Sequence, residues 1–400
     1  MEKRIHIIDG MRGFSLFGIL LANLLIFQYG LWGKDEIHLF PLSPLDKNFY
    51  AFTKIAIESS FMPIFTFLFG YSMMMMRERF AYNNLRIKWH LFRRSCLLVI
   101  IGILHATFLW DGDILLLYGV MGLFLLVFVN RKAKTLLIWG SVLFLAIAFL
   151  NLYPTEDEEL LEPALLTSYI HTTTEVYQTG SYSEITTYRN HSEDPLSQSM
   201  SEGEIGAILL LMPFTIAPMF LFGMYAAKRG FFRRPQQEKR HYLIGAVIGL
   251  ILGLGMKAYG YFLAQTSFVM IGGIILAFGY ISLIGLLYSK FPTSRLFMYF
   301  EQVGKLSLTN YIFQTVICTT VFYGYGFGLF GKVGVFKAML FGILIFVMQI
   351  AFSCLYIKYF RYGPLEKIVR IGTYLSFFNK PKKRKGARKS SSEQNLLSEL

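Results

Sequence analysis

The amino-acid sequence predicts an all-α fold, a polytopic transmembrane helix bundle with about ten membrane-spanning helices. Three observations support this prediction: the composition, the length of the apolar runs and the distribution of charge between them. Of the 400 residues, 54% are hydrophobic and 17% are aromatic, whereas only 16% are charged. This composition provides too little polar surface to cover a soluble globule, so we expect the chain to be solvated by lipid.

The apolar runs set the number of spans, because a helix needs about 20 residues to cross the hydrocarbon core of a bilayer. The second, third and fourth runs are short, and we expect those helices either to be tilted differently or to be extended by polar-flanked turns. In chain order, the expected spans are 13–31, 60–76, 95–110, 114–130, 135–153, 205–227, 242–264, 268–288, 306–323 and 336–360.

The charges between the runs predict the orientation of each span. Six Lys and Arg residues lie in 77–94, whereas the segment 156–204 holds eleven acidic residues and a single base, Arg189. Because Lys and Arg stay on the cytoplasmic side of a bilayer, these two segments are expected on opposite faces. The basic loops at 131–134, 228–240 and 290–305 are then also expected on the cytoplasmic side. The sequence therefore predicts a multi-pass protein of the inner cell membrane with both termini in the cytoplasm.

This order of spans indicates one transmembrane domain over residues 1–379, with an external acidic loop inserted at 154–204. We expect a short helix or a surface segment within 158–182. The alternatives for the loop as a whole are an ordered but chemically inert external cap and a partly disordered loop. Residues 380–400 read as a disordered cytoplasmic tail, in which seven positive charges lie between Lys380 and Lys389. The net charge of +14 is concentrated in this tail and at helix ends, which favours anionic membrane lipids as partners rather than nucleic acid.

The sulfur-containing residues give no sign of a metal centre. Cys96, Cys318 and Cys354 all lie in apolar runs and lack metal-ligand spacing. Four consecutive methionines, 73–76, point in four directions around a helix and cannot all bind one ion, so packing explains them better than copper binding. We expect no metal site and no disulfide framework.

Polar residues near the start of the first span form one candidate site. Asp9 and Arg12 are three residues apart, so they share a helix face at the cytoplasmic end, and Asn23 follows about three turns later near mid-membrane. In one interpretation, Arg12 anchors the helix to lipid, Asp9 caps it and Asn23 contacts a neighbouring helix. The other is an Asp–Arg pair that holds the phosphates of an acyl carrier.

His105 is the most suggestive single residue, because an ionisable side chain inside an apolar run is a candidate for function. Asp111 and Asp113 follow just past the end of the same helix. A carboxylate that folds back onto His105 would fix the imidazole tautomer and raise its basicity, as a general base requires. The alternative is a histidine that bonds a neighbouring helix, with 111–113 as a tight turn.

Further polar residues are predicted at two depths. Glu58 and Lys257 fall at the external side, where they are expected to line one cavity with His105, Asp111 and Asp113. Asn310 and Arg361 fall toward the cytoplasmic side, next to the expected site of Asp9 and Arg12. We therefore expect Asp9, Arg12, Glu58, Lys257, Asn310 and Arg361 to contribute to substrate binding.

Several strings in this chain together resemble the YeiB-like family of bacterial membrane proteins, whose shared region is a domain of unknown function. They are IDGMRG at 8–13 with Asn23, FTFLFG at 65–70, LH at 104–105, WDGDIL at 110–115 with Tyr118, GKLSLTNY at 304–311 and RYGPLE at 361–366. The opening segment is also similar to that of heparan-α-glucosaminide N-acetyltransferase and its bacterial relatives. Only Asp9, Arg12, Gly13 and Asn23 carry this second resemblance.

The second resemblance implies a transmembrane acyltransferase with a cytoplasmic acyl-CoA-type donor and a small-molecule or glycan acceptor. In that hypothesis His105 with Asp111 or Asp113 removes a proton from the acceptor, and Asn23 donates to the developing oxyanion. The residues themselves identify no cofactor and leave the oligomeric state open. The alternative is a transporter or flippase in which Glu58, His105 and Lys257 relay protons or substrate, and the paired prolines Pro213 and Pro218 hint at the broken helix that some transporters contain.

Overall fold

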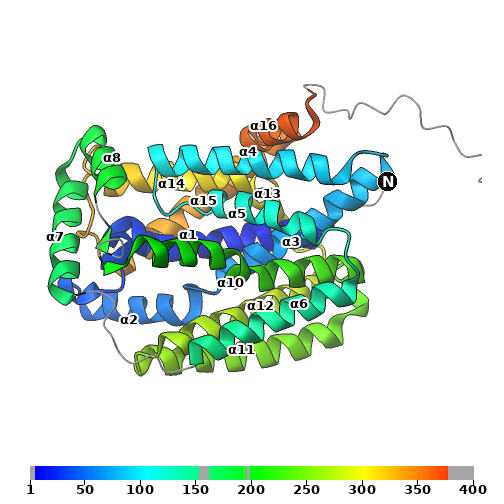
Figure 1. Ribbon diagram of the computed structural model, residues 1–400, viewed down its shortest axis with the longest axis horizontal. Helices are drawn as coiled ribbons and strands as arrows, with labels where there is room; N and C mark the ends of the chain where they lie inside the picture. The colour runs from blue at the N-terminus through cyan, green and yellow to red at the C-terminus, as the bar shows by residue number, and fades with distance from the viewer. Residues whose placement is uncertain (1–4, 153–161, 193, 196–198, 377–400) are drawn as a thin grey trace, which may run out of the picture.

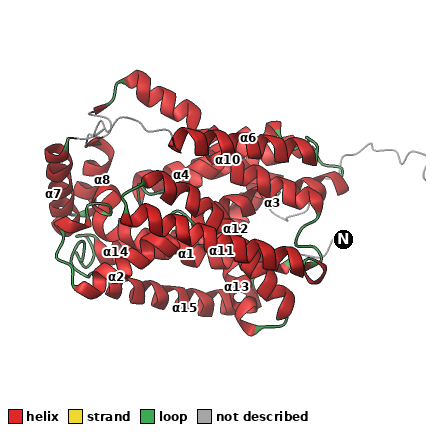
Figure 2. Cartoon of the chain, turned by 90° about the horizontal axis from the view of Figure 1, so that it is seen from below, coloured by secondary structure: helices red, strands yellow, loops and turns green. Residues whose placement is uncertain are grey.

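The computed structural model describes residues 5–152, 162–192, 194–195 and 199–376, and within these ranges it contains helices and no strands (Figures 1 and 2). The expected tail at 380–400 lies outside the described residues. The α-helices, with the numbering used in Figure 1, are α1 His6–Gly33, α2 Pro44–Phe52, α3 Phe61–Tyr82, α4 Ile87–Phe108, α5 Leu115–Phe124, α6 Ala133–Leu152, α7 Pro163–Thr179, α8 Tyr182–His191, α10 Glu202–Arg229, α11 Lys239–Phe262, α12 Thr266–Lys290, α13 Arg295–Lys305, α14 Ser307–Phe322, α15 Val335–Tyr359 and α16 Pro364–Tyr374. The short turns are η1 Ile37–Leu39, η2 Thr53–Ile57, η3 Leu125–Val127 and η4 Pro235–Gln237.

Eight helical segments in the described part of the chain are long and apolar enough to cross a membrane, so the prediction of an all-α polytopic bundle is confirmed. Two of the ten expected spans are short helices in the structure. The span expected at 114–130 is a helix of residues 115–127, about 20 Å long, and the one expected at 306–323 is α14, with 16 residues and about 24 Å. Both are shorter than a hydrocarbon core of about 30 Å.

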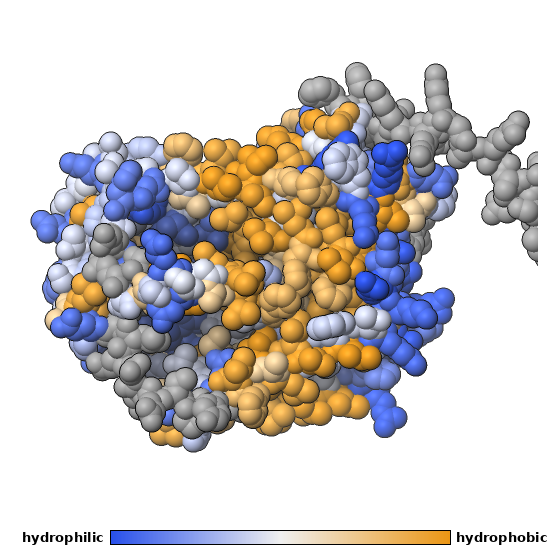
Figure 3. All heavy atoms as spheres, in the orientation of Figure 1, coloured by the Kyte–Doolittle hydropathy of each residue, from blue (hydrophilic) through white to orange (hydrophobic). Residues whose placement is uncertain are grey.

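The long helices run side by side, and their apolar side chains form a belt between two polar ends (Figures 1 and 3). The most buried of the eight segments is α1, which packs against α3, α13, α14 and α15. Two further groups flank this centre: α10 packs on α3 and α6, and α11 forms a hairpin with α12. Because α1 lies at the centre, polar side chains on it face protein rather than lipid.

The acidic loop folds into a cap over one end of the bundle. Its helix α7 lies across that end, while the N-terminal end of α1 and the turn between α3 and α4 lie at the opposite end (Figure 1). Helix α8 begins at a capping box in which Ser181 and Glu184 each accept a hydrogen bond from the other's backbone N–H. Ser201 and Glu204 start α10 in the same way.

Helix α10 is continuous. Pro213 and Pro218 both lie inside it, and its backbone keeps helical geometry from Glu202 to Arg229. The broken helix that these prolines hinted at is absent at this place in the described chain. This removes the one sequence feature that pointed specifically to a transporter-like discontinuous helix.

The charge pattern predicts which end of the bundle faces outward, and cysteine labelling tests it. Ser183, on α8, is exposed, and in a background without the three native cysteines we expect Ser183→Cys to react with a membrane-impermeant maleimide on intact cells. Thr293→Cys is the matched control, because Thr293 is exposed in the basic turn between α12 and α13. Labelling of Thr293→Cys but not Ser183→Cys would reverse the orientation.

Candidate functional site

His105 is buried in the bundle and contacts a carboxylate on one side of its ring. Its Nδ1 lies 2.8 Å from Oδ1 of Asp113, and both side chains are almost inaccessible to solvent. This is an ion-pair distance, although the angle at these atoms is outside the range of a hydrogen bond. The other carboxylate oxygen of Asp113 accepts a hydrogen bond of 2.6 Å from the backbone N–H of Leu116, at the start of α5. Asp113 therefore links His105 to the first turn of α5.

The opposite side of the His105 ring meets α14. Its Nε2 lies 3.0 Å from Oγ1 of Thr315, a buried residue that the sequence did not single out. Tyr311, one turn earlier on the same face of α14, packs its ring 5.3 Å from the imidazole. With a proton on Nδ1 facing Asp113, Nε2 is the acceptor and the Thr315 hydroxyl is the donor. The i, i+4 spacing of Tyr311 and Thr315 is the signal that could have identified this helix face.

The two short helices explain why a polar site exists at this depth. The turn between α4 and α5 folds back into the bundle, where the Tyr311 hydroxyl accepts a hydrogen bond of 3.3 Å from the N–H of Ile114. Trp110, in the same turn, is buried, stacks on Phe27 of α1 at 4.0 Å and meets the His105 ring edge-on. Irregular backbone inside a bundle is tolerated where protein groups satisfy its polar atoms. The short α5 and α14 therefore leave room for a polar turn next to His105.

Asp111 does not join this group, although the sequence placed it there. It is one of the residues that line a cavity of about 170 Å³ beneath α7 and α8, and part of its surface is exposed. The protein around the carboxylate raises its pKa by desolvation, and the positive charge of Arg189 acts in the opposite direction. Asp111 and Asp113 are two residues apart, but Asp111 lines the cavity whereas Asp113 contacts His105.

The Asp9–Arg12 pair lies at the opposite end of α1. Arg12 donates a hydrogen bond of 2.9 Å to Oδ1 of Asp9, and its second terminal nitrogen donates to the Ser72 hydroxyl on α3. Asp9 is buried, so this pair faces the protein and not the lipid. Arg94, which the sequence did not identify, lies near enough for the charge of Arg12 to act on it. Its Nε is buried without a hydrogen-bond partner among the described residues.

The remaining polar residues of α1, α14 and the chain after α15 lie apart from one another. Asn23 is half-buried, and its side chain has no hydrogen-bond partner in the described part of the chain. Asn310 is completely buried and donates to the carbonyl of Val303 and to the hydroxyl of Ser353. Arg361 is exposed and stacks over the Tyr362 ring at 5.5 Å. Its contacts are thus those of a surface residue.

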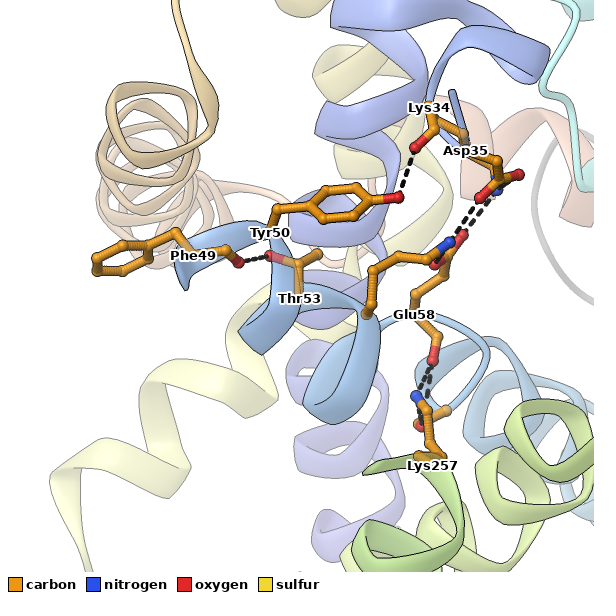
Figure 4. A network of polar contacts seen from close by, with 9 residues as sticks. Lys34, Asp35, Phe49, Tyr50, Thr53, Glu58 and Lys257 are labelled. Atoms are coloured by element: carbon orange, nitrogen blue, oxygen red, sulfur yellow. Dashed lines mark hydrogen bonds and ion pairs between the residues drawn. The ribbon is translucent and has the colours of Figure 1, made fainter. Parts of the chain in front are cut away.

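Glu58 and Lys257 do lie together, but in a group of their own (Figure 4). The Lys257 ammonium donates to the backbone carbonyl of Glu58 and, at 3.0 Å, to the hydroxyl of Ser60. The Glu58 carboxylate instead pairs with Lys34 at 2.8 Å and with Lys54 at 2.5 Å. No hydrogen bond or ion pair within the described ranges joins this group to His105. The expected single cavity is thus divided into three polar groups.

Known proteins resemble the chain over almost its whole length. Residues 226–376 match the family described as "Protein of unknown function (DUF418)". The uncharacterized protein YxaH of Bacillus subtilis (strain 168) is 33% identical in an alignment of 386 positions that covers 94% of this chain and 96% of YxaH. The uncharacterized protein YeiB of Escherichia coli (strain K12) is 28% identical in an alignment of 394 positions that covers 92% of this chain and 96% of YeiB.

Proposed function

Because this chain belongs to the YeiB-like DUF418 family and has the helices of a multi-pass membrane protein, we propose that it is a membrane acyltransferase. In this proposal an acyl-CoA-type donor binds near Arg12 and Arg94, and an acceptor hydroxyl or amine reacts beside His105. The observation that carries the proposal is the environment of His105, whose ring is held between the Asp113 carboxylate and the Thr315 hydroxyl.

His105 has the contacts that general-base catalysis requires. A carboxylate at Nδ1 favours the tautomer with a free Nε2 and stabilises the imidazolium that forms when Nε2 takes a proton. The acceptor oxygen or nitrogen would replace Thr315 as the partner of Nε2 and attack the thioester carbonyl. The carbon–sulfur bond then breaks as the new acyl bond forms, and the proton held on His105 passes to the leaving thiolate. General-base assistance of this kind contributes about 10²–10⁴-fold to a rate.

The Arg12 end has the charge that a donor with phosphate groups requires. Asp9 occupies one nitrogen of Arg12, whereas Nε of Arg94 is buried and has no partner among the described residues. The nearby Glu366 carboxylate receives three hydrogen bonds from the first turn of α14, two from backbone N–H groups and one from the Thr309 hydroxyl. Arg12 and Arg94 lie close enough for their charges to act on each other, and two neighbouring guanidinium groups suit the phosphate groups of a donor.

The length of α1 sets the distance between the proposed donor site at Arg12 and the proposed reaction site at His105. Arg12 and Phe27, which stacks on Trp110 beside His105, are 15 residues apart on one helix. This separation corresponds to about 22 Å along the helix axis. An acyl carrier bound by its phosphates at Arg12 therefore needs a long arm to bring its thioester to His105. Asn23 lies between these two residues on α1, where its unpartnered amide can donate to the carbonyl oxygen during attack.

Ligand-dependent stability tests the donor site on purified protein. We expect coenzyme A to raise the thermal unfolding midpoint of the wild-type chain, and Arg12→Lys or Arg94→Lys to lose most of that increase, because lysine cannot replace the planar fork of arginine. Arg93→Lys is the matched control, since Arg93 stacks over Trp89 at 4.9 Å on the same helix. It should keep the full increase. Equal increases in wild type and Arg12→Lys would remove the donor site.

A transporter is the second candidate, and the group in Figure 4 favours it. Lys257 is fully buried in α11 and is bound to a carbonyl and a hydroxyl rather than to a carboxylate. Buried ionisable groups of this kind occur in proton and substrate pathways. Loss of proton-coupled uptake in vesicles on Lys257→Met, with no effect of coenzyme A on the unfolding midpoint, would favour transport over acyl transfer.

A further inference from the structure

The cavity beneath α7 and α8 has walls made mainly of aromatic rings. Its volume is about 170 Å³, and the rings that line it come from α1, the turn after α4, α7, α8 and the chain after α14. They include Trp32, Trp110, Tyr169, Tyr177, Tyr188 and Tyr323. Such a density of aromatic side chains around one hollow, together with a few polar groups, is characteristic of small-molecule sites.

The charges in this cavity favour a cation. Asp111 and Asp194 both line it, and Arg189 is the basic residue among its lining groups. Both terminal nitrogens of Arg189 are already bound, one to the carbonyl of Leu109 at 3.0 Å and one to that of Thr107 at 2.6 Å. Arg189 thus serves to cap the last carbonyls of α4. The lining of the cavity thus holds more carboxylates than guanidinium groups, which favours a cation.

The ring faces of this cavity suit an organic cation. Aromatic faces attract ammonium groups, most strongly when the site is desolvated. Asp111 is among the same lining residues, and its carboxylate can pair with a cation. The ring faces and Asp111 therefore suit an ammonium group.

We infer that this cavity binds a small organic ammonium ion, with the ammonium group against the aromatic rings and Asp111. The inference goes beyond the proposed acyl transfer and does not depend on it, because no step of that reaction uses Asp111, Asp194 or Arg189. The cavity is thus a second binding site at the end of the bundle opposite Arg12.

Calorimetric titration of the full-length protein in nanodiscs with choline tests the inference. We expect saturable binding of choline and at least about tenfold weaker binding of 3,3-dimethyl-1-butanol, which has the same shape without the charge. Asp111→Asn should weaken choline binding by about tenfold. Glu175→Gln is the matched control, since it removes an acidic side chain from an exposed position on α7 outside the cavity lining, and it should leave binding unchanged.

The comparison of choline with its neutral analogue uses the wild-type chain, so the test remains decisive if Asp111→Asn does not fold. Equal binding of the two compounds, or no saturable binding of choline, would overturn the inference. Tighter binding of a neutral sugar such as glucose than of choline would also overturn it and would identify a polyol site. Loss of choline binding in Glu175→Gln equal to that in Asp111→Asn would show that only the general charge of the cap matters, which also contradicts the inference.

Discussion

Replacing His105 with glutamine is expected to lower the proposed acyl transfer by about 10²–10⁴-fold, because glutamine can hydrogen-bond but cannot accept the proton of the acceptor. The measurement is the transfer of a radiolabelled acetyl group from acetyl-CoA, supplied on the side of Arg12 in membrane vesicles, to any product other than acetate. Asp113→Asn should produce a loss of similar size, since asparagine cannot stabilise the imidazolium. Retention of transfer in both variants would exclude the general-base role of His105.

Stability measurements separate this catalytic effect from a structural one. His105 and Asp113 are almost inaccessible to solvent, so removing one partner leaves the other polar group buried without its contact. Each single variant is expected to be destabilised by about 3 kcal/mol, and the double variant His105→Gln, Asp113→Asn by less than the sum. A purely structural pair would regain transfer in the double variant as stability returns. We expect transfer to remain lost.

The second large effect is expected at the crossing of α1 and α13. A Cβ added to Gly304 would lie 1.9 Å from the carbonyl oxygen of Asp9, and one added to Gly13 would lie 2.0 Å from that of Phe300. These two backbones touch, so a side chain must push α13 away from α1. Gly304→Leu should therefore destabilise the protein by about 3 kcal/mol or more, measured by the thermal unfolding midpoint in detergent.

Gly255→Leu is the control for this prediction, because a Cβ at Gly255 on α11 would meet no atom within 4 Å. It should unfold within a few degrees of the wild-type midpoint. The leucine would also press on the backbone of Asp9, the residue that pairs with Arg12. We therefore expect folded Gly304→Leu protein to lose its response to coenzyme A. A wild-type midpoint for Gly304→Leu would show that the helices do not approach as closely as described.

The packing of the helices also explains why the sequence did not predict the contacts that Arg12 makes with other helices. The i, i+3 spacing correctly suggested that Arg12 can reach Asp9 on the same helix face. Its other contact, Ser72, is 60 residues away on α3, and Arg94 comes from a third helix. Nothing in the local pattern around Arg12 indicates which helix packs beside it, because the crossing is set by small residues such as Gly13 on both partners.

The contacts of His105 were likewise predictable from the sequence only in part. The sequence identified His105 as a polar residue within an apolar run and Asp113 as a carboxylate within reach. It could not choose between Asp111 and Asp113, because their directions depend on how the turn at 109–114 folds back against Tyr311. Thr315, which completes the contacts of the ring, is 210 residues away in the chain. A threonine in an apolar helix has no local feature that marks it as a partner of a distant histidine.

The sequence by itself determined the class of the protein, since composition and run length decide whether a chain can be covered by water or must be covered by lipid. It also predicted the acidic cap and the basic turns, which lie at opposite ends of the bundle (Figure 1). Only the tertiary structure decided that α5 and α14 are short, that the α4–α5 turn enters the bundle, and that the polar residues form three separate groups. The physical reason is that hydropathy depends on neighbours along the chain, whereas a polar site inside a bundle depends on which helices pack closely enough to satisfy its hydrogen bonds.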